Sequence, residues 1–263
     1  MITAAVIIIG DEILSGRTQD ANLNYIASKL RSCGIDLQEC RVVSDKEDAI
    51  IEAVQALSKR NTYVFTTGGI GSTHDDITSA SVAKAFNKAL VVHDDALKLL
   101  ESYYGDNINN ARRRMALAAE GAILHERMVF QIENVFIMAG IPKVMHEMFD
   151  NLLPKLQHGE PILSVSLKAY VLENDLADEL IDIQKSSSDV AIGSYPFYEE
   201  NNKGTCLVAT SRDATRLAMV EKQLQALIDS KGHIQVRSAT RCKFSLKASR
   251  GVNHPKDFLG VVL

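Results

Sequence analysis

The alternation of short apolar runs with helical patterns constrains the fold of this chain more than any other feature. Residues 3–9 form a continuous apolar run that is rich in valine and isoleucine and too short for a stable helix, which is typical of a strand buried on both faces. A helical pattern follows at 20–33, and further strands are predicted at 35–43 and 62–67. This order, with right-handed crossovers, predicts a doubly wound, mostly parallel α/β sheet covered by helices.

The remaining signals in the first 158 residues extend this domain. Residues 44–47 form a capping box, with Ser44 as the predicted N-cap and Glu47 at the third helical position. The helix that it opens carries Ile50, Ile51, Val54 and Leu57. Pro142 suits the first position of a helix that continues over 143–156. A tight turn is predicted at 133–134 between two strands. The strands and helices expected here span 128–132 and 135–139, and 77–87, 97–103 and 111–118.

The pattern changes near residue 159, which predicts a second, smaller domain over 159–236. Strands at 162–172, 190–198, 205–210 and 233–236 and helices at 175–185 and 213–230 follow the β-α-β-β-α-β order of ferredoxin-like α+β domains. Residues 237–263 carry six basic and one acidic side chain with little periodicity. We interpret them as a solvated basic tail, which is the commoner case, and not as a nucleic-acid arm.

Composition excludes several classes of partner. The net charge of −4 provides no overall basic field, so no nucleic-acid partner is expected. No apolar run approaches the roughly 20 residues of a membrane helix, and the first run lacks the flanks of a signal peptide. The four cysteines show no CxxC spacing, which favours reduced thiols in a cytoplasmic protein.

The strongest local signal is the loop that follows the third predicted strand. Its glycines allow the backbone to turn sharply and to approach an anion closely, and its hydroxyl groups add hydrogen-bond donors. It lies where open α/β sheets bind ligands. It is neither a P-loop nor a dinucleotide fingerprint, because no lysine follows the glycines and the spacing differs. The residues expected to bind phosphate here are Thr67, Gly68, Gly69, Gly71, Ser72, Thr73 and Thr78.

Carboxylates next to this loop conflict with a bare phosphate site. Asp75 and Asp76 would repel phosphate unless a hard divalent cation lay between them, and Asp45 follows the neighbouring strand. Alternatively, Asp76 caps the next helix, Asp75 is solvated, and Asp45 favours a helix N-terminus by its charge. His74 could be a ligand, a hydrogen-bond donor or an acid–base group.

Three further segments are candidates for the same site. The loop after the first strand offers Gly10, Asp11, Glu12, Gly16 and, in the next helix, Asn22. Ordinary turn chemistry explains Asp11 and Glu12 equally well when each is taken singly. Arg112 could bind phosphate, although an arginine run is most often a solvated helix face. Gly140 and Pro142 could close the pocket or only begin a helix.

Taken together, these motifs resemble a known family. Residues 10–16, Asn22, 43–45, 68–78 and 139–142 occur in the order found in the molybdopterin-binding domain of molybdenum-cofactor biosynthesis proteins. The closer likeness is to the amino-terminal part of the competence/damage-inducible protein A family and to the related domain of FAD synthases. Residues 160–236 resemble the second, ferredoxin-like domain of that family. Two departures are Ser72, where the family has proline, and Ala139, where it has proline in Leu-Pro-Gly-Val-Pro.

The resemblance implies a homo-oligomer that binds a small nucleotide or pterin phosphate. Its competence/damage-inducible branch implies a divalent-metal-dependent pyrophosphatase acting on dinucleotides such as ADP-ribose or FAD. We therefore expect Asp45, Asp76 and His74 to be catalytic, and Asp45, Asp75 and Asp76 to bind Mg²⁺ or a similar ion such as Co²⁺. No prosthetic flavin or haem is expected. The alternatives are a molybdopterin adenylyltransferase, in whose branch the acids match Asp45 and Asp76, and a non-catalytic nucleotide- or pterin-binding module.

Overall fold

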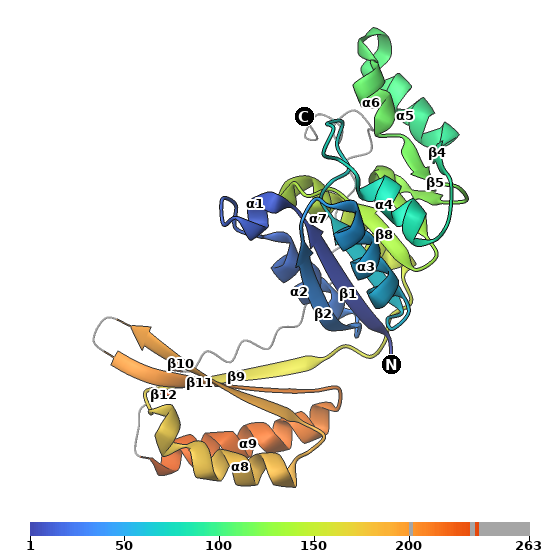
Figure 1. Ribbon diagram of the computed structural model, residues 1–263. Helices are drawn as coiled ribbons and strands as arrows, with labels where there is room; N and C mark the ends of the chain where they lie inside the picture. Colours follow the sequence, from blue (N-terminus) through green and yellow to red (C-terminus); the bar gives the residue numbers. More distant parts are fainter. Residues whose placement is uncertain (200–201, 232–234, 237–263) are drawn as a thin grey trace. The chain divides into compact units, whose positions relative to one another are not determined.

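The computed structural model describes residues 1–199, 202–231 and 235–236. Internal contacts divide these residues into two compact units, the first ending at Gly159 and the second beginning at Glu160. Each unit is described by itself (Figure 1). Within the described residues, no helix is both long enough and apolar enough to cross a membrane.

The first unit contains the larger set of elements. Its strands are β1 (Thr3–Ile9), β2 (Asp36–Val43), β3 (Tyr63–Thr67), β4 (Leu90–Val92), β5 (Leu117–Ala119), β6 (Ile123–His125), β7 (Val129–Ile132) and β8 (Val135–Met138). Its helices are α1 (Asp11–Leu14), α2 (Asn22–Ser32), α3 (Glu47–Ser58), α4 (Thr78–Ala85), α5 (Asp94–Tyr104), α6 (Asn110–Arg114) and α7 (Pro142–Leu152). Short 3-10 turns lie at Gly105–Asn107, Glu126–Met128 and Leu153–Lys155.

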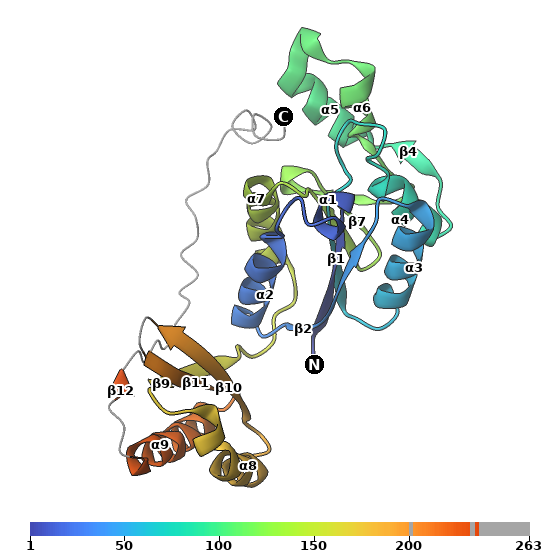
Figure 2. The same cartoon turned by 60° about the vertical axis from the view of Figure 1, so that its left-hand side comes forward.

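A six-stranded sheet forms the core of this unit, in the order β2-β1-β3-β8-β7-β6. The first four strands are parallel, and β7 and β6 add antiparallel pairs at one side. Helices α2 and α7 pack against each other, as do α3 and α4, and the two pairs cover opposite faces of the sheet (Figure 2). The side chains of β1 are buried from Ala4 to Ile9, as a strand covered on both faces requires. The predicted doubly wound α/β fold is confirmed.

The parallel register brings the carboxyl ends of four strands to one edge of the sheet. Ile9 pairs with Val43 and Thr67 pairs with Met138, so the loops after β1, β2, β3 and β8 all leave from that edge. These loops contain most of the residues singled out from the sequence. The fold therefore positions the candidate site directly.

Several local predictions were wrong. Helix α3 begins at Glu47 with Lys46 as N-cap and no side-chain capping bond, so Ser44 does not cap it. The helix predicted over 111–118 ends at Arg114, and residues 117–119 form β5 instead. Tertiary pairing decides this, because Ala118 is buried opposite Val91 in an antiparallel pair. The short elements α1, β4 and β6 were not predicted.

The second unit has the predicted ferredoxin-like arrangement. Strands β9 (Leu163–Ala169), β10 (Ala191–Glu199), β11 (Asn202–Ser211) and β12 (Gln235–Val236) form a sheet in the order β10-β11-β9-β12. Helices α8 (Ala177–Ser186) and α9 (Ala214–Ser230) follow β9 and β11, with a 3-10 turn at Glu173–Asp175 before α8. Asp213 caps α9 by accepting hydrogen bonds from the Thr215 and Arg216 amides. The basic tail predicted at 237–263 lies outside the described residues.

Candidate active site

The glycine loop after β3 is shaped by close contact with neighbouring strands. Gly68 has a φ of 102°, and a Cβ there would lie 2.1 Å from the Ile9 carbonyl oxygen. Gly69 has a φ of 65°, and its Cβ would lie 2.3 Å from the Thr78 hydroxyl. That hydroxyl is buried and donates to the Gly68 carbonyl over 2.9 Å. Only glycine fits both positions, so the loop is held against the end of β1.

The Asp76 carboxylate closes this loop from within. One of its oxygens accepts from the Gly71 amide over 2.6 Å, and the other accepts from the Thr73 amide over 2.7 Å and from the Thr73 hydroxyl. Helix α4 has Ile77 as N-cap without a side-chain bond, so Asp76 does not cap it. Two amides expected to hold phosphate thus bind the protein's own carboxylate. The Gly69 and Ile70 amides, which have no acceptor among the described residues, are the donors left for a ligand.

Acidic side chains from separate loops gather beside the glycine loop. The Asp11 amide donates to the Asp45 carboxylate over 2.8 Å, joining the loops after β1 and β2. Burial raises the pKa of Asp45, and the negative charges of Glu12, Asp11 and Asp75 raise it further, against the opposing effect of the Asp11 amide. Acidic side chains that follow β1 and β3 are therefore close enough to Asp45, which follows β2, to repel its negative charge.

Asn22 links helix α2 to the loop after β8. Its side-chain amide donates to the Gly140 carbonyl over 2.7 Å, and the residue is 4% exposed. Gly140 itself packs tightly, because a Cβ there would lie 3.1 Å from the Gly68 Cα. Pro142 then begins α7. Asn22 therefore positions the segment that forms one wall of the site.

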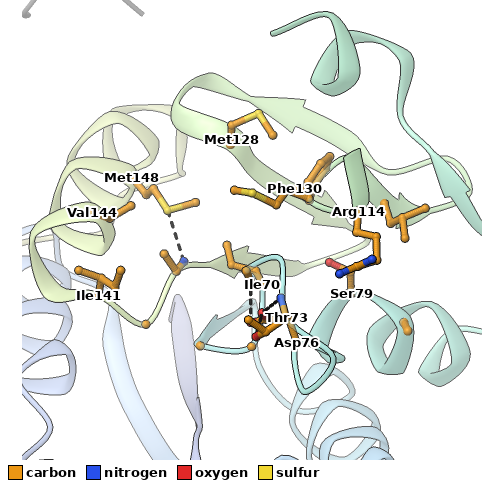
Figure 3. Close-up of a pocket in the computed structure, with 18 of the residues that line it drawn as sticks. Ile70, Thr73, Asp76, Ser79, Arg114, Met128, Phe130, Ile141, Val144 and Met148 are labelled. Carbon is orange, nitrogen blue, oxygen red and sulfur yellow. Dashed lines mark hydrogen bonds between the residues drawn. The ribbon is translucent and has the colours of Figure 1, made fainter. Parts of the chain in front are cut away.

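A pocket of about 450 Å³ opens at this edge of the sheet. Polar groups lie on one side of it, with Thr73, Asp76, Ser79 and Arg114 around the glycine loop (Figure 3). Apolar side chains from β7, α7 and the loop before β7 form the other side (Figure 3). The lining residues are Glu12, Thr18, Gly68, Gly69, Ile70, Gly71, Thr73, Asp76, Ser79, Ala80, Leu90, Arg114, Met115, Leu117, Met128, Phe130, Ala139, Gly140, Ile141, Pro142, Val144 and Met148.

Other residues singled out from the sequence do not line this pocket. The His74 side chain is 98% exposed and lies 3.9 Å from an Asp75 oxygen. Arg112 stacks on the Tyr104 ring at 4.3 Å and contacts the Asn107 carbonyl. The other predicted residues that do not line the pocket are Gly10, Asp11, Gly16, Asn22, Asp45, Thr67, Ser72, Asp75 and Thr78.

Arg114 occupies the position that the sequence suggested for Arg112. It lines the pocket, and its guanidinium donates to the Ser72 carbonyl over 2.6 Å. The run of three arginines gives no signal that separates Arg114 from its neighbours. For Val144 and Met148 a signal existed, since residues four apart lie on one face of a helix. Met128 and Phe130 show a two-residue alternation, but only the tertiary structure shows that they face a cavity.

The three carboxylates expected to bind metal do not form a site by themselves. In the described parts of the chain, no three histidine, cysteine, aspartate or glutamate side chains are grouped so that they could hold a metal ion. Both Asp76 oxygens are engaged in the loop, and one Asp45 oxygen is engaged by the Asp11 amide. The residues present do not fit a resident metal centre, and we assign no catalytic step to one.

Comparison with known proteins agrees with the family resemblance seen in the motifs. Residues 5–158 match the family described as "Probable molybdopterin binding domain", and residues 161–237 match "FAD synthase, middle domain". A protein of Archaeoglobus fulgidus is 32% identical over 232 residues, which cover 86% of this chain and 98% of that protein.

Two named relatives are longer than this chain. A "Putative competence-damage inducible protein" of Alkaliphilus oremlandii is 30% identical, and the match covers 73% of this chain and 50% of that protein. A "Probable FAD synthase" of Caenorhabditis elegans is 28% identical, covering 88% of this chain and 50% of that protein. A solved structure of the protein CinA from Thermoplasma acidophilum, described as of unknown function, has a TM-score of 0.55 and 28% identity. It covers 58% of this chain and 96% of that one.

Proposed function

This chain belongs to the family of probable molybdopterin binding domains through residues 5–158, and we propose that its pocket binds a pterin or a nucleotide. The pocket would contact both the ring and the phosphate of that ligand. We further propose that it hydrolyses a phosphoanhydride in dinucleotides such as ADP-ribose or FAD. The single observation that carries this proposal is the division of the pocket into an apolar side and a side of loop amides and charged groups.

The apolar side suits a flat heteroaromatic ring. Met128, Phe130 and Met148 offer an aromatic face and polarizable thioethers, which pack well against such rings. A volume of about 450 Å³ lies within the range of ordinary small-molecule sites. The ring provides binding energy and the polar side fixes the orientation of the ligand.

The opposite side suits a phosphate group. The Gly69 and Ile70 amides and the Arg114 guanidinium are donors of the kind that bind phosphoryl oxygens. Asp76 keeps the loop in its turn by bonding Gly71 and Thr73. Phosphoryl transfer requires mainly positioning and neutralisation of charge, so a protein nucleophile is unnecessary.

The nearby carboxylates determine the form of the substrate. Because Glu12, Asp45 and Asp75 repel a bare diphosphate, we propose that the substrate is a diphosphate already carrying Mg²⁺ or Co²⁺. In hydrolysis the water oxygen forms a bond to phosphorus, the bond to the bridging oxygen breaks, and that oxygen leaves with the other phosphate. Glu12, which lines the pocket, accepts the proton of the water.

The proposal is tested by incubating the purified full chain with FAD or ADP-ribose, in the presence of Mg²⁺, Co²⁺ or a chelator. With either cation we expect FMN and AMP from FAD, and AMP and ribose 5-phosphate from ADP-ribose, and we expect no product with chelator. Glu12→Gln should lower kcat by at least about a hundredfold, whereas the same change at exposed Glu52 should leave it intact. Failure of hydrolysis in every condition contradicts the proposed activity.

Two further measurements on the same protein, an incubation with ATP and molybdopterin and a calorimetric titration, separate the other two candidate functions. Consumption of ATP only when molybdopterin is also present, with release of diphosphate, indicates adenylyl transfer. Calorimetric binding of ADP-ribose or FAD without turnover indicates a non-catalytic module. Asp76 gives that second outcome a specific basis, because its carboxylate occupies two amides that a phosphate would otherwise use.

A further inference from the structure

The Glu12 carboxylate lies against the bare Cα of Gly10. A Cβ built on Gly10 would fall 2.7 Å from each carboxylate oxygen of Glu12 and 2.8 Å from the carbon between them. Cβ atoms in proteins essentially never come within 3.0 Å of another atom, so a side chain at residue 10 and the carboxylate exclude each other. The absence of a side chain at Gly10 therefore makes room for the carboxylate of Glu12.

The backbone at residue 10 does not require glycine. Its φ of 165° and ψ of 120° describe an extended conformation that other residues also adopt. The Gly10 amide donates to the Val43 carbonyl over 3.1 Å, and the Gly10 carbonyl accepts from the Ile13 amide over 3.2 Å. An alanine would keep both bonds, because they involve only the main chain. The contact with Glu12 is what remains to explain the glycine.

The main chain of Glu12 is fixed, but its carboxylate is not hydrogen-bonded. The Glu12 carbonyl accepts from the Thr18 amide over 3.1 Å and from the Ser15 hydroxyl over 3.3 Å. Within the residues that the structure describes, the carboxylate has neither a hydrogen-bond donor nor an ion-pair partner. The space above Gly10, and no polar contact, therefore determines where this carboxylate lies.

Asp76 makes the same kind of contact with a different consequence. It is the other carboxylate that lines the pocket, and a Cβ on Gly71 would lie 2.6 Å from one of its oxygens. The Asp76 oxygens also accept from the Gly71 and Thr73 amides, so moving them would break hydrogen bonds. Moving the Glu12 carboxylate breaks none. A methyl group at residue 10 should therefore displace a carboxylate without loosening the fold.

From this geometry we propose that Gly10 is a positioning residue that holds open the place of the Glu12 carboxylate beside the pocket. The inference rests on the proposed function, in which Glu12 accepts the proton of the attacking water. Gly10 does not line the pocket, so it acts on the reaction only through Glu12. A general base must lie within hydrogen-bonding reach of the proton that it takes, and a displacement of about 1 Å is enough to slow a chemical step markedly.

Gly10→Ala tests the inference in steady-state hydrolysis of FAD or ADP-ribose with Mg²⁺ or Co²⁺. We expect kcat to fall at least about tenfold, because the base no longer reaches the water. The KM should change by less than about twofold, because the groups that bind the substrate stay in place. The Tm should remain within about 2 °C of the wild-type value, because only a side-chain end without bonds is displaced.

Gly193→Ala is the matched control. Gly193 lies in β10 of the second unit, and a Cβ there would lie 2.9 Å from the side chain of Tyr195, again two residues further along the chain. The Tyr195 side chain is exposed and free to turn aside. This variant makes the same chemical change in a similar setting away from the pocket, so it should keep the kcat and the Tm of the wild type.

Two further measurements decide whether Gly10 acts through Glu12. Glu12→Gln already removes the base, so adding Gly10→Ala to it should lower kcat by less than about twofold more. Crystal structures of the wild type and of Gly10→Ala should show the Glu12 carboxylate moved away from residue 10, with the main chain unchanged.

The outcomes separate this inference from the proposed function. Hydrolysis with an unchanged kcat in Gly10→Ala, independent losses in the double variant, equal losses in Gly193→Ala, or a Glu12 carboxylate that keeps its place would overturn the inference alone. Absence of hydrolysis by the wild type would overturn the proposed function and the inference together.

Discussion

The Asp11 amide donates a hydrogen bond to the Asp45 carboxylate over 2.8 Å, across 34 positions of sequence. This bond joins the ends of β1 and β2 at the sheet edge where the glycine loop also leaves β3. It holds a carboxylate in a setting that burial and three neighbouring acids make unfavourable for its charge. A carboxylate whose ionised form is held in a cleft against an electrostatic penalty is typical of a functional site.

Replacing Asp45 by asparagine should therefore stabilise the fold at neutral pH. The folded-state pKa of Asp45 lies above its ordinary value of 3.8, so the folded state binds this proton more tightly than the unfolded state does. The carboxyl is neutral in both states below that value, and its ionisation costs stability as the pH rises. We expect Asp45→Asn to raise the Tm by roughly 1–3 °C at pH 7. In thermal melts the difference should shrink toward pH 3, and a lower Tm at pH 7 would contradict the assignment.

Gly68 should tolerate no side chain. Gly68→Ala combines an unfavourable φ with a Cβ placed 2.1 Å from the Ile9 carbonyl. The free energy of unfolding in urea should fall by about 3 kcal/mol. Gly16→Ala is the control, since Gly16 also has a positive φ but open space around its Cβ position. That change should cost only about 1 kcal/mol. Equal losses would show that close approach of the strands does not shape the loop.

Removing the Asn22 side chain should loosen the wall that begins at Gly140. Asn22→Ala removes a buried side chain and leaves the Gly140 carbonyl without its 2.7 Å hydrogen bond, which should cost about 2 kcal/mol in urea unfolding. Asn151→Ala breaks a local bond to the Glu147 carbonyl within α7 and should cost less than about 1 kcal/mol. A larger loss for Asn151 than for Asn22 would argue against the positioning role.

Asp76 should act first on the order of its own loop. Asparagine offers one acceptor oxygen in place of two, so Asp76→Asn should speed hydrogen exchange of the Gly71 and Thr73 amides about tenfold. Asp48→Asn makes the same change in charge on an exposed side chain outside the loop and should leave both amides protected. Unaltered exchange in the Asp76 variant would show that other contacts hold the loop.

The sequence was most informative where a local pattern and the global topology agree. The apolar run of β1, the glycine stop after α2 and the glycine loop after β3 all predict a parallel sheet with its loops at one edge, and that arrangement is present. Convergence of Asp11 and Asp45 could be predicted because parallel strands end on the same side of a sheet.

Features that depend on side-chain direction could not be predicted from the sequence. Asp76 directly precedes the helix predicted over 77–87, which suits a helix cap equally well, and only the structure shows its carboxylate turned back to the loop. Arg112 and Arg114 are indistinguishable in a run of arginines, yet one stacks on Tyr104 and the other lines the pocket. The strand β5 was hidden because alanines favour helices unless a partner strand buries them.

A titration of ¹⁵N-labelled protein with Mg²⁺ and ADP-ribose tests the central claim most directly. If the strand ends form a ring-and-phosphate site, the largest amide shift changes should fall on Gly69 and Ile70, accompanied by Ile141 at the apolar wall. The second unit, Glu160 onward, should change little. Saturable binding whose shift changes avoid the glycine loop would contradict the account, as would the absence of any shift change with ADP-ribose and with FAD.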